Sequence, residues 1–442
     1  MARIRRAAQS APQEVLVPEA EQPYAVPENW RWVRLGGICS FIGGGTPNKN
    51  IPEYWNGNIP WASVKDIKGK FLYNTLDSIT ESGLRNSSSN VCDLDDIIIV
   101  TRISPGNVAV AKTVLAVNQD LKIVKTQLNN LFLYYCFVCL KNEFIARSSG
   151  TTVLGITLSR VQEICVPLPP RAEQERIVAR IESLFARLDK AREKVDAVLG
   201  RCAARKAALL HKAFSGELTA GKAIKNILLE DIVLDIKIGP FGSMLHKDDY
   251  ISNGVPIVNP KHIEGQKILV AINNTISKDK AEELAVYALK ENDIVLGRRG
   301  EMGRCAPVSC AESGWICGTG SMIIRLKPEY NAKFYSLFIS SCQGMRYLEE
   351  HAVGTTLKNL NEKIVRKLPV PSFSQQEQAE IVRILDELLA RERRAQEAAE
   401  RVAARIEQIK RAVLTKAFRG ELGTNDPAEP AALTEQGSLS LA

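Results

Sequence analysis

The feature that most constrains this chain is an internal duplication. When the sequence is shifted against itself, "KAFSGEL" at 212–218 falls on "KAFRGEL" at 416–422, and Gly-Thr-Thr at 150–152 falls on Gly-Thr-Thr at 354–356. Over the block 150–218, roughly 26 of 69 positions agree without a gap. An ungapped match of this length predicts that the chain folds as two copies of one unit.

Both copies of the block contain a long run with apolar residues at alternating spacings of four and three. The positions are Ile177, Ile181, Leu184, Leu188, Ala191, Val195, Val198, Cys202, Arg205 and Leu209 in the first copy, and Ile381, Leu385, Leu388, Glu392, Ala395, Ala399, Val402, Ile406, Ile409 and Val413 in the second. This spacing is that of a coiled coil. It predicts two helices of more than about forty residues that pack against each other as an antiparallel pair. Two ordinary amphipathic helices on separate cores are the alternative.

The ends of both predicted helices carry recognisable signals. Two prolines precede the first helix, and Ser374 with Glu377 forms a capping-box pattern before the second. Near the other end, Phe214 is followed by Gly216, and Phe418 by Gly420. A glycine at positive φ stops a helix, so we expect each phenylalanine to anchor the last turn on a neighbouring domain. An exposed phenylalanine there would instead serve a partner subunit.

Composition limits the class of protein without identifying it. The 442 residues are 45% apolar and 24% charged, and the net charge of +8 suits an anionic partner without proving one. The longest apolar block, 131–140, is far shorter than the roughly 20 residues that span a bilayer, so a cytoplasmic protein is expected. Ten cysteines without zinc-ligand spacing predict buried free thiols and no metal site, including the pair Cys136 and Cys139.

The regions outside the helical runs contain short strand-like segments with many Gly, Pro and Asn turn signals. These two regions echo each other faintly. The segment 32–47 parallels 226–243, "NIPWASVKDI" at 58 parallels "GVPIVNPKHI" at 254, and "DDIIIVTRISPGNV" at 95 parallels "NDIVLGRRGEMGRC" at 292. We expect an α+β protein with two similar mixed domains whose details have diverged.

These motifs together resemble a known family. "GTT" followed by "VPLPPRAEQERI", a long heptad helix and a terminal "KAFSGEL", all duplicated, is similar to the specificity subunit of type I restriction-modification systems. The resemblance covers about 28 to 422. It implies an N-terminal arm at 1–27, a first target recognition domain at 28–169, a long spacer helix at 170–218, a second target recognition domain at 219–373, a second spacer helix at 374–422 and a polar C-terminal tail at 423–442.

The same resemblance implies a function and its partners. The chain would bind double-stranded DNA at an asymmetric bipartite site, with one half-site per domain. The duplication and the rod formed by the two helices predict half-sites about one helical turn, roughly 34 Å, apart. Methyltransferase subunits, two of them, would dock on the helices, and restriction and translocation subunits would join the full complex. No cofactor is expected in this chain, because S-adenosylmethionine would belong to the methyltransferase partner.

Candidate DNA contacts follow from charge and from turn position. They are Lys49, Lys65, Arg102, Ser104 and Asn107 in the first domain, and Lys247, Lys261, Arg298, Arg299 and Arg304 in the second. Arg102 and Arg299 occupy equivalent places after a strand and before a glycine, so a loop tip would carry each into a groove. A solvated surface charge is the alternative for each residue. The Gly-Thr-Thr at 150–152 either forms a structural turn or touches phosphate.

Two other classes of function stay open at this point. A self-contained nucleic-acid-modifying enzyme would need catalytic or cofactor motifs, yet the sequence has no Walker A loop, and its four histidines lie apart from one another and from cysteine. A coiled-coil adaptor for proteins alone would need no DNA contact. We therefore predict a non-catalytic DNA-recognition subunit.

Overall fold

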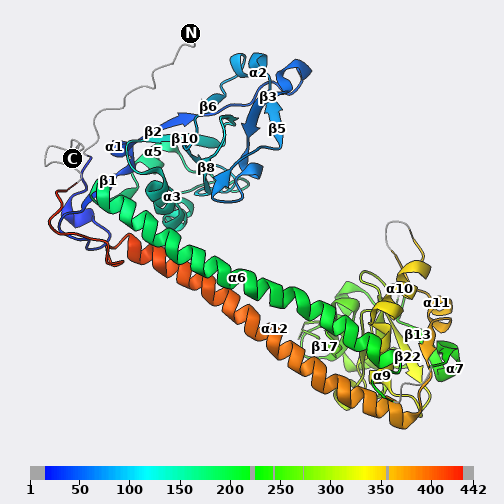
Figure 1. Ribbon diagram of the computed structural model, residues 1–442. Helices are drawn as coiled ribbons and strands as arrows, with labels where there is room; N and C mark the ends of the chain where they lie inside the picture. Colours follow the sequence, from blue (N-terminus) through cyan, green and yellow to red (C-terminus); the bar gives the residue numbers. More distant parts are fainter. Residues whose placement is uncertain (1–14, 220–223, 242–243, 272, 355–357, 432–442) are drawn as a thin grey trace. The chain divides into compact units, whose positions relative to one another are not determined.

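The computed structural model describes residues 15–219, 224–241, 244–271, 273–354 and 358–431 (Figure 1). The basic segment "MARIRR" at the N-terminus lies outside this range. The chain forms two compact units, Met1–Glu193 with Val402–Ala442, and Lys194–Arg401. Each unit contains a mixed lobe of sheets and short helices together with one part of each long helix. The predicted α+β class is confirmed.

The lobe of the first unit ends where the first long helix starts. Its strands are β1 (Arg31–Arg34), β2 (Cys39–Gly43), β3 (Trp55–Ala62), β4 (Phe71–Leu72), β5 (Asp77–Ile79), β6 (Asn90–Cys92), β7 (Ile97–Val100), β8 (Val108–Ala111), β9 (Leu115–Val117), β10 (Leu121–Thr126) and β11 (Cys165–Leu168). Its helices are η1 (Glu19–Glu21), α1 (Leu35–Ile38), η2 (Pro52–Tyr54), η3 (Val64–Asp66), α2 (Glu81–Arg85), α3 (Asn130–Cys139), α4 (Lys141–Ala146) and α5 (Leu158–Gln162).

The lobe of the second unit has a similar order of elements, with differences among its short strands and 3-10 helices. Its strands are β12 (Asn226–Leu228), β13 (Val233–Ile238), β14 (Tyr250–Ile251), β15 (Val255–Val258), β16 (Ile263–Glu264), β17 (Lys267–Ile268), β18 (Thr275–Ile276), β19 (Asp293–Gly297), β20 (Cys305–Pro307), β21 (Ile316–Cys317), β22 (Ser321–Leu326) and β23 (Pro369–Pro371). Its helices are α7 (Leu229–Ile232), η4 (Lys247–Asp249), η5 (Pro260–His262), α8 (Lys278–Glu283), η6 (Ala285–Tyr287), η7 (Cys310–Glu312), α9 (Ala332–Ile339), α10 (Cys342–His351) and α11 (Glu362–Arg366).

The sheet topology confirms that the two lobes are copies. In the first, β2-β10-β7-β8 are neighbours in a larger sheet that also includes β4, and β5-β3-β9-β6 form another. In the second, β13-β22-β19-β20 repeats β2-β10-β7-β8, and β18-β15-β21 repeats β5-β3-β9, with β15 parallel to β21 as β3 is to β9. The fourth strand of the smaller sheet differs, because β6 lies beside β9 in the first lobe and β14 lies beside β18 in the second. Each lobe also has a two-stranded pair, β1-β11 or β12-β23, that joins its first strand to the strand before a long helix. The faint sequence echo therefore reports a shared fold.

The long helices are α6 (Arg171–Phe214) and α12 (Gln375–Ala417), of 44 and 43 residues, which confirms the predicted length. Within each unit they run side by side in opposite directions (Figure 1). The ion pairs between them fix this direction, because partners later in α6 lie earlier in α12. They are Asp189–Lys410 at 2.5 Å and Arg192–Glu407 at 3.8 Å in the first unit, and Arg205–Glu392 at 2.9 Å in the second.

The polar interruptions of the two predicted seams thus face each other. Arg205 donates through Nε to both carboxylate oxygens of Glu392, at 2.9 Å each. In the sequence, Arg205 and Glu392 interrupt the apolar heptad pattern at different points of the two copies. The antiparallel alignment makes them one charge pair, which favours this register over neighbouring ones.

The placement of Val402 in the seam was wrong. Its side chain is 49% exposed, and Ile409 is 37% exposed, whereas Ala403 and Ile406 are buried. A straight helix drifts by about 20° per heptad relative to a strict repeat of 3.5. Here the buried position lies one residue later along α12, at 403 and not at 402, while the predicted seam residues Ala399 and Ile406 stay buried.

The buried ends of the long helices belong to the cores of the lobes. In the first unit, Ile177 and Ile181 from α6 and Phe418 after α12 lie in one core cluster. In the second, Phe214 from α6 lies in a cluster with residues of α12, Ile381 and Leu385. The remaining seam residues singled out from the sequence, Leu184, Leu188 and Leu388, are half-buried. The phenylalanine of each repeated phrase is therefore an anchor into a lobe.

The predicted start and stop signals are confirmed. Helix α6 begins directly after Pro170, and Ser374 and Glu377 form the reciprocal capping bonds at the start of α12, at 2.9 and 3.3 Å between backbone nitrogen and side-chain oxygen. Gly216 and Gly420 have φ of +85° and +74°. These left-handed conformations end the two helices, and the backbone changes direction after each of them.

Candidate nucleic-acid interface

Each lobe presents an arginine at the tip of a hairpin loop. In the first unit, β7 and β8 are buried along their whole length, and the loop between them is closed by the N–H of Gly106 on the carbonyl of Val100 at 3.0 Å. Gly106 takes a φ of +83°, as this tight closure requires. The Arg102 side chain, 56% exposed, leaves the loop toward solvent.

The loop between β19 and β20 of the second unit has the same construction. The N–H of Gly297 bonds to the carbonyl of Arg304 at 2.8 Å, as the N–H of Val100 does to Asn107. Arg299 is exposed at the position equivalent to Arg102. Its neighbour Arg298 is half-buried, and burial together with the nearby Arg299 charge lowers the pKa of Arg298.

The Gly-Thr-Thr turn lies beside the arginine loop. Arg102 forms an isolated β-bridge with Gly155, and Ser149 forms another with Gly155, so the segment 149–155 is a turn closed against the loop. In the second unit, Arg299 bridges Asn359 and Val353 bridges Asn359 in the same pattern. The structural-turn interpretation is thereby confirmed for 150–152, and Thr151 and Thr152 are exposed. Thr355 and Thr356 of the second copy lie outside the described residues.

The two arginines differ in their acidic neighbours. Asp120, whose side chain is 11% exposed, lies 3.4 Å from Arg102 between Oδ1 and Nη1. The carbonyl of Asp120 accepts from Thr101, and in the second unit the carbonyl that accepts from Arg298 is that of Gly320. Glycine therefore stands where the first lobe has aspartate, and within the described ranges no carboxylate pairs with Arg299. The second loop carries more uncompensated positive charge.

An aspartate at the base of the strand that leads into each arginine loop is paired with a cation of the neighbouring strand. The sequence did not predict these pairs. At the base of β7, Asp96 is paired with Lys125 of β10 at 2.6 Å. At the base of β19, the nearly inaccessible Asp293 accepts from Arg325 of β22 at 2.8 and 2.7 Å. The hydrogen bonds that Arg325 donates to Asp293 raise the pKa of Arg325 against the effect of burial. Each pair ties the loop-bearing strand to its neighbour across the sheet.

Two segments that together carry four candidate residues of the second lobe, η5 and the loop after β19, pack against each other. Pro260 of η5 is the meeting point: its carbonyl is 3.5 Å from Nη1 of Arg304, and its ring is the nearest atom group to a Cβ built at Gly297 or Gly320. Lys261 follows on η5, and Arg298 and Arg299 follow Gly297. Arg304 is also paired with Glu301 at 2.6 Å, which lowers its net contribution to the charge.

The other candidates are less closely connected. Ser104 and Asn107 are half-buried parts of the first loop, where the N–H of Asn107 bonds to the carbonyl of Ser104 at 3.2 Å. Lys65 is exposed on η3, which has the same capped turn as η5. Lys49 and Lys247 are exposed, and across the described part of the chain no hydrogen bond or ion pair links them to the arginine loops.

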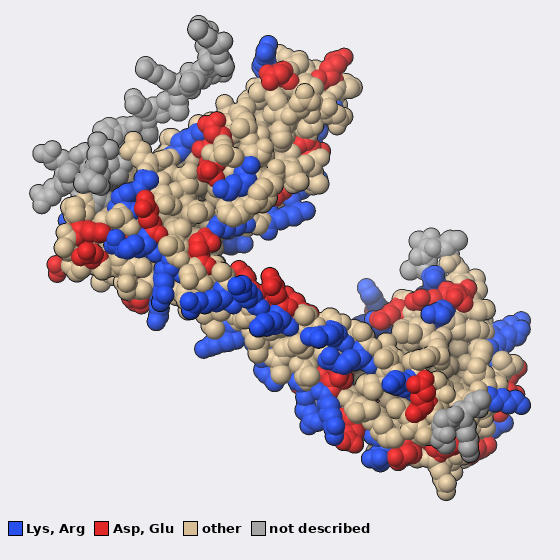
Figure 2. All heavy atoms as spheres, viewed as in Figure 1, with Lys and Arg blue, Asp and Glu red and all other residues tan. Residues whose placement is uncertain are grey.

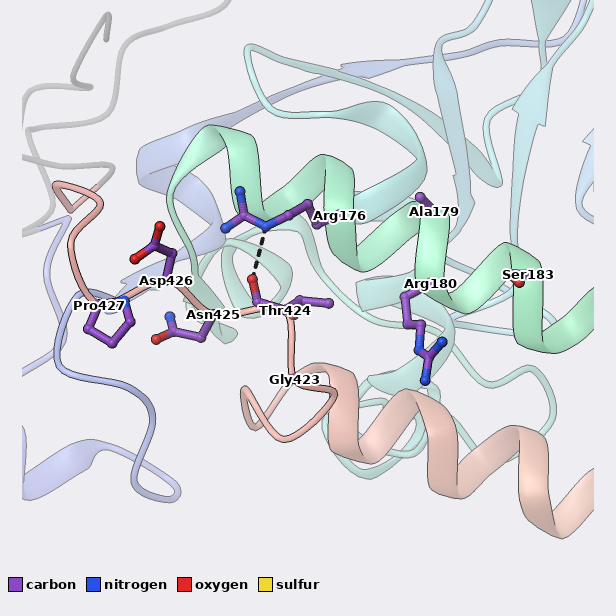
Figure 3. Close-up of a pocket in the computed structure, with 9 residues that line it drawn as sticks. All are labelled: Arg176, Ala179, Arg180, Ser183, Gly423, Thr424, Asn425, Asp426 and Pro427. Atoms are coloured by element: carbon purple, nitrogen blue, oxygen red, sulfur yellow. Dashed lines mark hydrogen bonds between the residues drawn. The ribbon is translucent and has the colours of Figure 1, made fainter.

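The described start of the polar C-terminal tail packs against the first turns of α6 (Figure 3). Arg176 of α6 donates to Glu429 at 2.7 and 2.8 Å and to the carbonyl of Thr424 at 2.9 Å. The fully buried carboxylate of Glu173 accepts from Nε1 of Trp30 at 2.7 Å and from Asn425 at 2.8 Å. The tail thus joins the start of α6 to the N-terminal strand region.

Surface charge and cysteine positions complete the picture. Figure 2 shows Lys and Arg side chains spread along α6 and α12 on the face in view, with Asp and Glu between them. Cys136 is buried, but Cys139, Cys310 and Cys342 are exposed, so the prediction of buried thiols was wrong for these three, which lie at the ends of short helices. Within the described ranges, no group of His, Cys, Asp and Glu could hold a metal ion, and no helix is long and apolar enough to cross a membrane.

Comparisons with known proteins agree with the duplicated architecture. The family described as type I restriction modification DNA specificity domain matches residues 27–196 and 235–400. The type I restriction enzyme EcoBI specificity subunit of Escherichia coli is 24% identical over 332 residues, which cover 70% of this chain and 69% of that protein.

Two solved structures share the fold. A chain from a structure of a type I R-M system complex superimposes with a TM-score of 0.72 at 20% identity, over 90% of this chain and 100% of that one. The HsdS subunit from Thermoanaerobacter tengcongensis gives 0.51 at 20% identity, over 91% and 100%. Because the family match covers both lobes and most of the chain, this protein belongs to the type I restriction-modification DNA specificity family.

Proposed function

We propose that this chain is the non-catalytic DNA-recognition subunit of a type I restriction-modification complex. Its role in DNA sequence recognition follows from the family. The observation that carries the finer proposal is the arginine loop, which recurs in both lobes with the same hydrogen bond at its base and the same β-bridges but with different tips. Two lobes with different tips suit an asymmetric site with two unlike half-sites.

Affinity and specificity would come from different residues. Exposed lysines such as Lys65 and Lys261 neutralise phosphates, which makes binding strongly dependent on salt but carries no sequence information. Arg102 and Arg299 at the loop tips contact base edges, where an arginine is able to donate two hydrogen bonds to guanine.

The partners follow from the family. Type I specificity subunits act together with methyltransferase and restriction subunits, and two methyltransferase subunits would match the duplication of the helices. S-adenosylmethionine would bind to the methyltransferase subunits. Val402 and Ile409, exposed apolar residues on one part of α12, are available for this docking.

The proposal is tested by sequencing methylated bases in a host that expresses this chain with its methyltransferase partner. We expect one asymmetric, gapped methylated site. An unmodified genome with both proteins present would contradict the proposal. Methyl transfer by the purified chain alone would indicate a self-contained enzyme, and a lack of salt-dependent DNA binding would indicate a protein adaptor.

Exchanging residues 28–150 for those of another family member is expected to change one half of the methylated site and leave the other half as it was. The reason is that each arginine loop is built within its own lobe. Methylome sequencing of the chimera measures this. A change in both halves would show that the lobes do not act separately.

Replacing Arg299 with alanine is expected to weaken binding to the specific site by roughly 5- to 150-fold and to relax the preference at one base pair of the second half-site. The first half-site should keep its preference. Binding of the complex to site variants, measured by fluorescence anisotropy, checks this. Arg85→Ala is the control, because Arg85 is an exposed arginine outside both arginine loops. It lies on α2, which packs on η2, β3 and β5, and its guanidinium is 3.8 Å from the carboxylate of Glu81. An equal loss at every sequence would mean that Arg299 contacts only phosphate.

A further inference from the structure

The two arginine loops can be compared residue by residue. Val100 and Gly297 donate to the residue seven positions on, Asn107 and Arg304, so the loops have equal length. The left-handed glycines near their ends are also equivalent, with φ of +83° at Gly106 and +77° at Gly303. The residue directly after the arginine is therefore Ile103 in the first loop and Gly300 in the second.

Ile103 has a backbone conformation that its side chain opposes. Its φ is +73°, close to the +84° of Gly300. For a β-branched residue this region is a genuine outlier, because the branched side chain crowds the backbone, whereas glycine adopts it freely. The loop holds Ile103 there through its N–H, which donates to the carbonyl of Leu154 at 2.8 Å. The same turn with glycine at this position would fold with less strain.

Packing inside the protein does not explain the isoleucine. Its side chain is 57% exposed, beside the exposed guanidinium of Arg102. A Cβ built at Gly300 meets no atom within 4 Å, so the equivalent turn leaves no cavity that a side chain must fill. The first loop thus accepts backbone strain in order to present a branched apolar group to solvent. Strain that stability does not require points to a functional contact.

We propose that Ile103 determines specificity by packing against the C5-methyl group of a thymine in the first half-site. This inference rests on the proposed function. In the major groove the thymine methyl is the one apolar group on the base edges, and apolar side chains recognise it. Arg102 and Ile103 together then recognise two adjacent features of the DNA, a hydrogen-bond acceptor and a methyl group. The second loop, with Gly300, lacks the apolar contact.

The test uses the complex of the full chain with its methyltransferase partner and a duplex that carries its methylated site. Each thymine of the first half-site is replaced in turn by deoxyuridine, which removes only the methyl group. With the wild-type chain, one replacement is expected to weaken binding about fourfold. The Ile103→Gly variant should bind the thymine duplex about tenfold more weakly and be indifferent to that replacement.

A purely structural role would give a different result. Because Ile103→Gly relieves a strained φ, the Tm of the variant should not fall, although its binding weakens. A lower Tm together with a uniform loss of binding would overturn the inference. Equal sensitivity to deoxyuridine in both proteins, or a first half-site without thymine, would also overturn it. Gly300→Ile serves as the matched control and should leave the response of the first half-site unchanged.

The outcomes separate this inference from the proposed function. A complex that binds no specific site contradicts the proposed function itself. A complex that binds its site but shows no thymine-methyl dependence linked to Ile103 contradicts only the inference. Retained binding and methyl sensitivity in Ile103→Gly would likewise assign the contact to another residue.

Discussion

Replacing Phe418 with alanine is expected to lower the free energy of unfolding of the first unit by about 4 kcal/mol. The ring is 2% exposed, lies 5.4 Å from that of Phe132 between centroids, and belongs to the core cluster of the lobe. Removing it leaves a cavity at the joint between the end of α12 and the lobe. Hydrogen exchange followed by mass spectrometry measures the loss of protection in residues 15–193 and 402–431.

The duplication supplies the matched variant. Phe214 has the same place in the second unit, 4% exposed and 5.4 and 5.2 Å from the rings of Phe334 and Phe338. Phe214→Ala should therefore release amides of the second unit and spare the first. Tyr73→Ala, at a residue 65% exposed, should change stability by less than about 0.5 kcal/mol. If both phenylalanine variants kept full hydrogen-exchange protection, Phe214 and Phe418 would not stabilise the contact between the helix ends and the lobes.

The sequence was most informative where the signal was local or repeated. The capping pair Ser374 and Glu377, and the glycine stops at 216 and 420, act over a few residues, so their patterns predicted the geometry directly. The heptad spacing predicted the antiparallel pair and its length. The family resemblance, read from the duplicated motifs, was confirmed over both lobes.

Other features depend on residues that are distant in sequence. A strict heptad pattern does not reveal whether the helix supercoils, so it misplaced Val402. Nothing near Arg102 in the sequence indicates that Asp120 faces it, or that a glycine replaces this aspartate in the second lobe. Glu173 and Glu377 are aligned copies, yet only Glu173 is buried beneath the C-terminal tail. Which of the candidate residues contact DNA stays a prediction.

The repeated aspartate-cation pair could have been predicted by aligning the two lobes. Asp96 directly precedes β7 and Asp293 is the first residue of β19, at the equivalent place of "DDIIIV" and "NDIVLG". An aspartate next to an apolar strand is costly to bury alone, so a cation had to be near. Its identity as Lys125 or Arg325 depended on the pairing of β10 with β7 and of β22 with β19.

Replacing Arg325 with methionine is expected to destabilise the second unit by about 3–5 kcal/mol. The side chain of Asp293 is 1% exposed, and the variant would leave its carboxylate buried without a countercharge. Methionine keeps the apolar stem, so the effect reports the lost charge and hydrogen bonds and not a cavity. Because β19 leads into the loop that carries Arg299, we also expect weaker discrimination at the second half-site. Urea unfolding followed by hydrogen exchange of the second unit measures the loss.

A control variant and a double variant test whether the buried, unpaired charge of Asp293 causes the loss of stability. Lys333 and Asp386 form a pair of the same length, 2.7 Å, but their side chains are 42% and 49% exposed, so Lys333→Met should cost at most about 1 kcal/mol. Adding Asp293→Asn to Arg325→Met removes the stranded charge and should restore a large part of the stability. Equal losses for Arg325→Met and Lys333→Met, or no recovery in the double variant, would mean that the pair does not hold the arginine loop through its buried charge.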